Sequence, residues 1–113
     1  MCYGPYTSFY KKGIYSKSDL FVACYDKQRL IGLCWGSERP RREVVLKGIA
    51  VEAKYWKKGI GKKLLKAFEK RVKNSGGEKI SLGAATNVIG FYTKASYKII
   101  KQKSKFTVME KKL

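Results

Sequence analysis

The sequence predicts an α/β fold with a mixed, mostly antiparallel central sheet flanked by helices. Several apolar runs have the length of strands and are separated by polar turns. Between them lies one long segment whose apolar residues recur at helical spacing. Along the chain the predicted order is three strands, a helix, a strand, a short helix and two strands. That order is typical of a sheet covered by helices.

The first two predicted strands form an antiparallel hairpin. They are LFVACY (20–25) and RLIGLCW (29–35), and the polar residues 26–28 between them predict the turn. SERPRRE (37–43) follows as a polar connection, because Pro40 is unfit for a central strand.

The third predicted strand is VVLKGIAV (44–51). Its nearly continuous apolar character favours burial on both faces. Gly48 interrupts it, and a glycine inside a strand often marks a bulge or a close approach by another chain or a ligand.

The long helix is predicted to begin after Gly59. The helix is predicted to end at Asn74-Ser75-Gly76-Gly77. Within it, Glu69 and Lys73 have the spacing of an i, i+4 ion pair. The apolar face of this helix consists of Ile60, Leu64, Leu65, Phe68 and Val72.

The remaining elements are short. KISLGAA (79–85) predicts a strand, and Thr86 or Asn87 can cap a short helix that runs to Lys94. YKII (97–100) and FTVME (106–110) predict a closing pair of strands.

Length and composition predict one domain over residues 1–113, with an irregular segment at 1–18. With 44% hydrophobic residues the chain can fill a core. No apolar stretch is long enough to span a bilayer. The first residues, MCYGPYTSFYKK, lack the order of a signal peptide, so a cytoplasmic location is expected.

The chain is strongly basic, with 26 Lys and Arg against 8 Asp and Glu, a formal charge of +18. Such a surface attracts polyanions in general and does not select one class. Nucleic acid, acidic membranes, acidic proteins and phosphorylated cofactors are all possible partners.

Cysteine and histidine counts argue against metal chemistry. Cys2, Cys24 and Cys34 lack metal-site spacing, and there is no histidine. Cys24 and Cys34 lie in apolar runs, which favours buried thiols over redox chemistry. Proton transfer must then use Glu, Asp, Tyr, Cys, Lys or water.

WKKGIGKK (56–63) combines glycines and lysines at the predicted start of the long helix. It is not a Walker A loop, because Trp56 and Lys63 stand where that motif needs Gly and Ser or Thr. It also lacks the third glycine of a dinucleotide fingerprint, since Leu64 stands there. Unpaired amides at a helix start, together with lysines, still suit a phosphate. The alternative is a basic turn followed by a solvated helix face.

Two motifs together resemble the GCN5-related N-acetyltransferase (GNAT) superfamily, which transfers acetyl from acetyl-CoA to amines. The first is LKGIAVEAKYWKKGIGKKLLKAFE (46–69), similar to a strand followed by R/Q-x-x-G-x-G/A. Trp56 replaces the usual Arg or Gln. The second is NVIGFYTKASYKII (87–100), similar to a family signature that contains, in this order, Asn, Ala, Phe-Tyr, Lys and Gly-Phe. The chain has Asn87, Phe91, Tyr92 and Lys94 in this order, while Gly90 stands for the alanine, Ser96 for the glycine and Tyr97 for the phenylalanine.

The resemblance covers roughly residues 20–110 and implies an acyl-CoA N-acyltransferase fold with a shortened N-terminal part. It implies acetyl-CoA as cosubstrate and CoA as product, and homodimers are common in the family. The implied cofactor-binding residues come from the third strand, the glycine loop and the second motif: Ile49, Ala50, Val51, Lys57, Lys58, Gly59, Ile60, Gly61, Lys62, Lys63, Asn87, Phe91 and Lys94.

The resemblance also implies catalytic roles. Tyr92 corresponds to the family's general acid for the CoA thiolate, and a phenol, with a pKa of roughly 10, carries its proton at neutral pH. Its alternative role is core packing beside Phe91. Asn87 either binds pantetheine or caps its helix. Glu43 is the preferred general base, with Glu38, Glu52 or water as alternatives.

The sequence therefore supports two hypotheses. The first is an acetyl-CoA-dependent N-acetyltransferase that acts on an amine of a small molecule or protein by direct transfer in a ternary complex. The second is a protein of the same fold with little turnover, which binds nucleic acid or an acidic partner through its basic surface.

Overall fold

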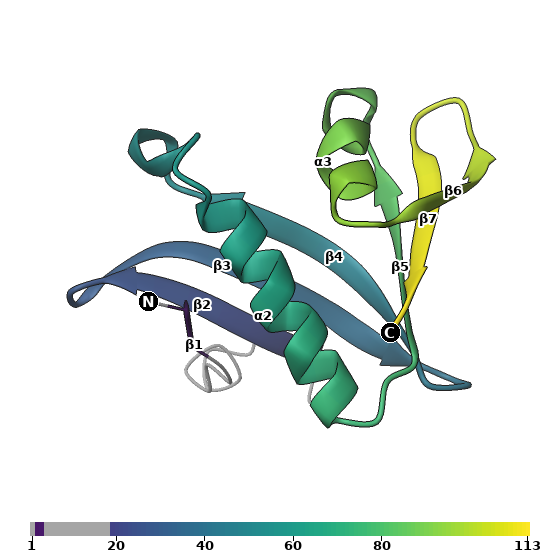
Figure 1. Cartoon of the computed structure of the whole chain (residues 1–113), viewed down its shortest axis with the longest axis horizontal. Coiled ribbons are helices and arrows are strands. Elements are labelled where there is room, and N and C mark those ends of the chain that lie inside the picture. Colours follow the sequence, from purple (N-terminus) through teal and green to yellow (C-terminus); the bar gives the residue numbers. More distant parts are fainter. Residues whose placement is uncertain (1, 4–18) are drawn as a thin grey trace.

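The computed structural model describes residues 2–3 and 19–113, which form a seven-stranded sheet and its helices. The strand order is β1-β2-β3-β4-β5-β7-β6, and every neighbouring pair is antiparallel except β4 and β5 (Figure 1). The predicted mixed, mostly antiparallel sheet is thus confirmed. Apart from β1, the predicted irregular segment 1–18 lies outside the described residues.

The elements follow the predicted order. The strands are β1 (Cys2–Tyr3), β2 (Asp19–Asp26), β3 (Arg29–Arg39), β4 (Glu43–Val51), β5 (Lys79–Ala84), β6 (Lys98–Gln102) and β7 (Thr107–Lys112). The helical elements are η1 (Ala53–Tyr55), α2 (Ile60–Asn74), η2 (Thr86–Val88) and α3 (Ile89–Lys94).

The β2–β3 hairpin turns where it was predicted, with Lys27 at a φ of 56°. However, β3 continues to Arg39 and β4 begins at Glu43, so the predicted polar connection at 37–43 is wrong over its first three residues and its last. These residues pair with the start of β4, which outweighs their polar character. The turn is confined to 40–42, where Pro40 needs no ladder partner.

The predicted irregularity at Gly48 is confirmed. Trp35 pairs with Gly48, and the next pair joins Gly36 to Leu46, so Lys47 is an extra residue in β4. A Cβ on Gly48 would lie 2.5 Å from Cη2 of Trp35. The strand therefore bulges at the point where the indole ring crosses its backbone.

Strands β4 and β5 pair over only three residues before they separate. Glu43, Val44 and Val45 lie opposite 79–81, and the strands diverge beyond them (Figure 1). The predicted burial of this strand on both faces is wrong: Val44 and Leu46 are buried, whereas Lys47 and Ala50 are exposed. Among the residues that the structure describes, no strand pairs with the β5 side of the second half of β4, and this edge is open.

Helix α2 covers one face of β2, β3 and β4 (Figure 1). All five residues of its predicted apolar face are buried. They pack with apolar residues of the strands and with Tyr97 in one core. Among the described residues, no helix is long and apolar enough to cross a membrane.

The two central cysteines are both buried. Cys34 is a free thiol, as predicted, and burial raises its pKa well above the usual value. Cys24 is also buried, but it is disulfide-bonded, so the prediction of a thiol is wrong at this position.

The crossing of Trp35 over Gly48 predicts a large difference between two glycine-to-alanine substitutions. Gly48→Ala forces the indole or the β4 backbone to move and should lower the free energy of unfolding by about 1–3 kcal/mol. In helix α3, a Cβ on Gly90 meets no atom within 4 Å. Gly90→Ala should therefore be neutral or stabilise by up to about 1 kcal/mol. Urea unfolding of both variants measures the difference, and equal stabilities would contradict the proposed contact.

Candidate active site

The N-terminus of α2 offers unpaired backbone donors. Gly59 precedes the helix with a φ of 79°, a left-handed conformation that suits glycine. The first intrahelical bond runs from the Lys63 amide to the Gly59 carbonyl at 3.1 Å. No side chain caps this end and no acidic residue lies in the first turn. The amides of 59–62 and the positive end of the helix dipole are therefore available to an anion.

The loop before α2 is tied back to the end of β4. The indole nitrogen of Trp56 donates to the Val51 carbonyl at 2.7 Å, while 64% of the Trp56 residue is exposed. This residue, which departs from the first motif, thus fixes the loop to the strand that precedes it. Lys57 and Lys58 are exposed beside it.

The predicted strand residues Ile49, Ala50 and Val51 lie in the open half of β4. They pair with 32–34 of β3 on one side and have no β5 partner on the other. Val51 lies directly before the turn that leads to α2, so the open strand edge and the helix N-terminus belong to one end of the molecule (Figure 1).

Helix α3 brings the second motif to the first. A Cβ on Gly61 would lie 3.6 Å from the Phe91 ring, so the two motifs meet although 30 residues separate them in the sequence. Asn87 is exposed in η2. The α3 cap position is Val88 and makes no side-chain cap bond, so the alternative that Asn87 caps this helix is wrong.

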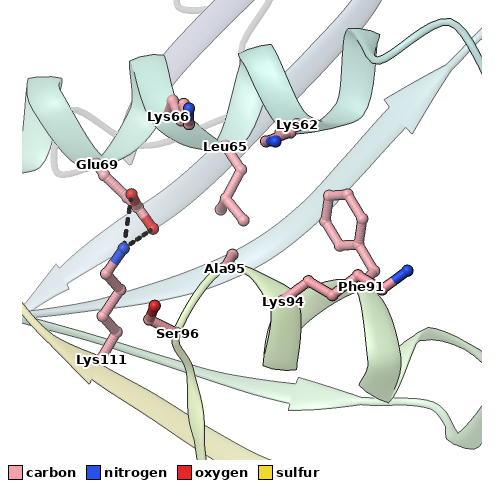
Figure 2. A pocket seen from close by; sticks show the side chains of 9 residues that line it. All are labelled: Lys62, Leu65, Lys66, Glu69, Phe91, Lys94, Ala95, Ser96 and Lys111. Carbon is pink, nitrogen blue, oxygen red and sulfur yellow. Dashed lines mark hydrogen bonds and ion pairs between the residues drawn. The ribbon is translucent and has the colours of Figure 1, made fainter.

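A cavity of about 380 Å³ lies between α2 and α3. Figure 2 shows Lys62 and Lys66 on the α2 side and Phe91 and Lys94 on the α3 side, with Leu65 among them. An aromatic ring with several ammonium groups suits an anionic, partly apolar ligand. Of these residues, Lys66 was not singled out by the sequence.

Tyr92 is half-buried beside the core, between two other aromatic rings. Its ring centroid lies 5.1 Å from that of Phe91 and 5.6 Å from that of Tyr97, both in edge-on geometry. Burial, and to a smaller extent the neighbouring Cys34, raise the pKa of Tyr92 to about 12. The phenol therefore keeps its proton at neutral pH, as a general acid requires.

Glu43 lies at the opposite end of β4 from the α2 N-terminus. The strand is nine residues long, so at about 3.3 Å per residue Glu43 and Val51 are roughly 26 Å apart. The Glu43 carboxylate pairs with Lys79 Nζ at 3.3 Å, and Lys79 also pairs with Glu110 at 3.4 Å. The hydrogen bond to Glu43 is the main cause that raises the pKa of Lys79. The structure therefore does not bring Glu43 to the other predicted site residues near α2.

Sequence reasoning missed a polar network next to Tyr92. The spacing of Glu69 and Lys73 predicted an i, i+4 ion pair, but the Glu69 carboxylate instead accepts bonds from Tyr97 and Lys111. These partners lie 28 and 42 positions away in the sequence, so no local pattern points to them.

Comparison with known proteins identifies the family. The profile described as the acetyltransferase (GNAT) family matches residues 3–97, most of the chain. A search of curated proteins gave no significant match.

Solved structures agree with this fold. A PaiA N-acetyltransferase from Thermoplasma acidophilum, in complex with coenzyme A, has a TM-score of 0.80 at 24% identity; the alignment covers 94% of this chain and 66% of that one, just under two thirds. An aminoglycoside 6'-N-acetyltransferase complexed with coenzyme A has a TM-score of 0.81 at 21% identity, and the alignment covers 97% of this chain and 81% of that one. An IAA acetyltransferase from Bacillus cereus has a TM-score of 0.79 at 19% identity, and the alignment covers 92% of this chain and 84% of that one.

At such identities the structural likeness establishes the fold, while the profile match over 3–97 establishes the family. The chain belongs to the acetyltransferase (GNAT) family.

Proposed function

We propose that this protein is an N-acetyltransferase that uses acetyl-CoA to acetylate an amine of a small molecule or protein. The observation that carries this proposal is the uncapped, glycine-opened N-terminus of α2 beside the open edge of β4. Amides at a helix start suit a pyrophosphate, and an unpaired strand edge suits an extended chain with amide groups. Acetyl-CoA combines a pyrophosphate with such a pantetheine arm.

Each part of the cosubstrate has residues to hold it. The amides of Gly59, Ile60, Gly61 and Lys62 bind the pyrophosphate, and Lys57, Lys58 and Lys63 add charge. The backbone of 49–51 pairs with the pantetheine arm, and Asn87 hydrogen-bonds it. Phe91 and Lys94 flank the ligand from α3, where Phe91 already lies beside Gly61.

The reaction is direct transfer between two bound substrates. The acceptor nitrogen attacks the thioester carbon, the bond from carbon to sulfur breaks, and the leaving sulfur takes a proton from Tyr92. The acceptor nitrogen loses its proton to water or a carboxylate. Glu43 stays a prediction for that base, and its carboxylate would first have to leave Lys79. Positioning of both substrates supplies much of the rate.

The fold does not determine which amine is the acceptor substrate. Three solved structures with this architecture carry different names: PaiA N-acetyltransferase, aminoglycoside 6'-N-acetyltransferase and IAA acetyltransferase. A shared fold therefore does not identify one acceptor. The charge of +18 disfavours polycationic amines at long range and favours amines carried by neutral or acidic molecules.

A second candidate function is nucleic-acid binding, and the surface around α2 favours it. Eight lysines of α2 and the preceding loop are exposed, and none makes an ion pair with an acidic residue in the part of the chain that the structure describes. They are Lys54, Lys57, Lys58, Lys62, Lys63, Lys66, Lys70 and Lys73. We call this set the α2 lysine face.

Acetyl-CoA binding tests the first proposal. Gly61→Glu places a carboxylate among the amides at the α2 N-terminus and should abolish the heat of binding in a calorimetric titration with acetyl-CoA. Asn74→Glu, the control, changes the charge equally at the other end of the same helix, about 20 Å away at 1.5 Å per residue, and should keep binding. Equal binding by both variants would refute the pyrophosphate site, and no binding by the wild type would refute the function.

The role of Tyr92 is tested separately from binding. Tyr92→Phe removes the proton donor but keeps the ring between Phe91 and Tyr97, so kcat should fall about 100-fold. The Kd for acetyl-CoA should change less than about twofold. CoA release, followed with a thiol reagent, measures the rate with hydroxylamine as the acceptor. An unchanged kcat would mean that Tyr92 only packs.

Salt dependence tests the second candidate. Binding of a fluorescent DNA duplex should weaken steeply between about 50 and 200 mM salt, as expected for contacts to phosphates. The triple charge reversal Lys66→Glu, Lys70→Glu, Lys73→Glu should abolish it. Lys101→Glu, Lys103→Glu, Lys105→Glu makes the same change in and after β6, away from the α2 lysine face. Equal losses in both variants, or no binding at about 50 mM salt, would exclude a nucleic-acid site on α2.

A further inference from the structure

Glu69 is the one acidic residue in α2, and it points inward. The helix sequence IGKKLLKAFEKRVKN carries six basic residues, yet Glu69 pairs with none of its neighbours on the helix. Its side chain is only 14% exposed. Lys111 Nζ of β7 donates to its two oxygens at 3.1 and 3.3 Å, and these bonds bridge the space between helix and strand in Figure 2.

The same carboxylate fixes the ring of Tyr97. The Tyr97 hydroxyl donates to Glu69 Oε2 at 2.9 Å, although the residue as a whole is only 3% exposed. Lys111 Nζ also lies over the Tyr97 ring, 5.7 Å from its centroid. Tyr97 is thereby held at its hydroxyl and at its face.

Tyr97 in turn contacts Tyr92 in two ways. The Tyr97 amide donates to the Tyr92 carbonyl at 3.0 Å, which closes the end of α3. The two rings meet edge-on at 68°, with their centroids 5.6 Å apart. The orientation of the Tyr92 ring therefore depends on a neighbour whose own orientation is set by Glu69.

We propose that Glu69 is a positioning residue for acetyl transfer, which acts through Tyr97 on the phenol of Tyr92. The inference rests on the proposed function, because it assumes that Tyr92 protonates the leaving sulfur. A proton donor must hold its hydroxyl toward one atom, and a small misplacement costs rate without weakening substrate binding. Tyr97 stands where the second motif has phenylalanine, so the hydroxyl that bonds Glu69 is a departure of this chain from that motif.

Steady-state kinetics with acetyl-CoA and hydroxylamine test the proposal. Glu69→Gln removes the charge that holds Lys111 and Tyr97, and Tyr97→Phe removes the hydroxyl alone. Each should lower kcat about tenfold and leave KM for acetyl-CoA within about twofold. The control is Glu78→Gln, which makes the same chemical change in the exposed pair between Arg42 and Glu78. It should leave both constants unchanged.

A double substitution separates positioning from general stability. In a Tyr92→Phe background, adding Glu69→Gln should lower kcat no further, because the group it positions is already gone. A tenfold loss in that background, or a wild-type kcat in Tyr97→Phe, would overturn the proposal. If Glu69→Gln does not fold, as judged by thermal melting, Tyr97→Phe and its double with Tyr92→Phe decide the question.

A measurement without turnover keeps this inference distinct from the proposed function. In protein labelled with ¹³C at the tyrosine rings, the Tyr92 signals are identified by their loss in Tyr92→Phe. Glu69→Gln and Tyr97→Phe should shift or broaden them, and Glu78→Gln should not. Unmoved Tyr92 signals would refute positioning. Absence of acetyl-CoA binding by the wild type, with moved signals, would refute the proposed function and with it the role in acetyl transfer, and would leave only the orientation of the Tyr92 ring by Glu69 and Tyr97.

Discussion

The separation of β4 from β5 after three residue pairs is the constraint on which the rest of the structure depends. A parallel pair that continued would satisfy the polar backbone groups of both strands. Because the pair stops at Val45 and Ser81, no strand of the described part of the chain lies on the β5 side of residues 46–51. Such an edge is normally paired, covered or used. The bulge at Lys47 and the indole of Trp35 across Gly48 lie where this separation begins. The site is thus a consequence of backbone geometry before any catalytic side chain is considered.

Charge acts on this opening in two different ways. The lysines of the α2 lysine face raise the local concentration of any polyanion, but exposed ammonium groups do not define one ligand. The specific element is the α2 N-terminus, where glycine conformation and the absence of a cap leave amides directed at one point. The α2 lysine face extends along the helix, and at the N-terminus it shares four lysines with the proposed pyrophosphate site: Lys57, Lys58, Lys62 and Lys63. Nucleic acid and acetyl-CoA should therefore exclude one another there, and each would weaken the apparent affinity of the other.

The sequence predicts much of the fold because local patterns decide it. The helical spacing of Leu64, Phe68 and Val72 and the glycine before the helix specify α2 almost to its ends. The strand at 44–51 shows the limit of this reasoning. Its apolar run predicted burial on both faces, but the open half of β4 keeps Ala50 exposed. An apolar strand edge can be covered either by an extended ligand or by a neighbouring strand. The two give the same apolar pattern, so the sequence predicted a buried strand.

The candidate site was predictable where its residues form motifs and not where they meet through the tertiary fold. Gly61 and Phe91 carry motif signals, and the structure brings them together. Glu69 carries a misleading one: its spacing to Lys73 suggests a surface pair, which is worth only a few tenths of a kcal/mol. A half-buried carboxylate gains more from a tyrosine hydroxyl and an ammonium group that share its low-dielectric surroundings. Glu69 therefore bonds Tyr97 and Lys111, which are distant in the sequence, rather than Lys73 on its own helix. Although α2 carries six basic residues, its one acidic side chain links the helix to residues 97 and 111.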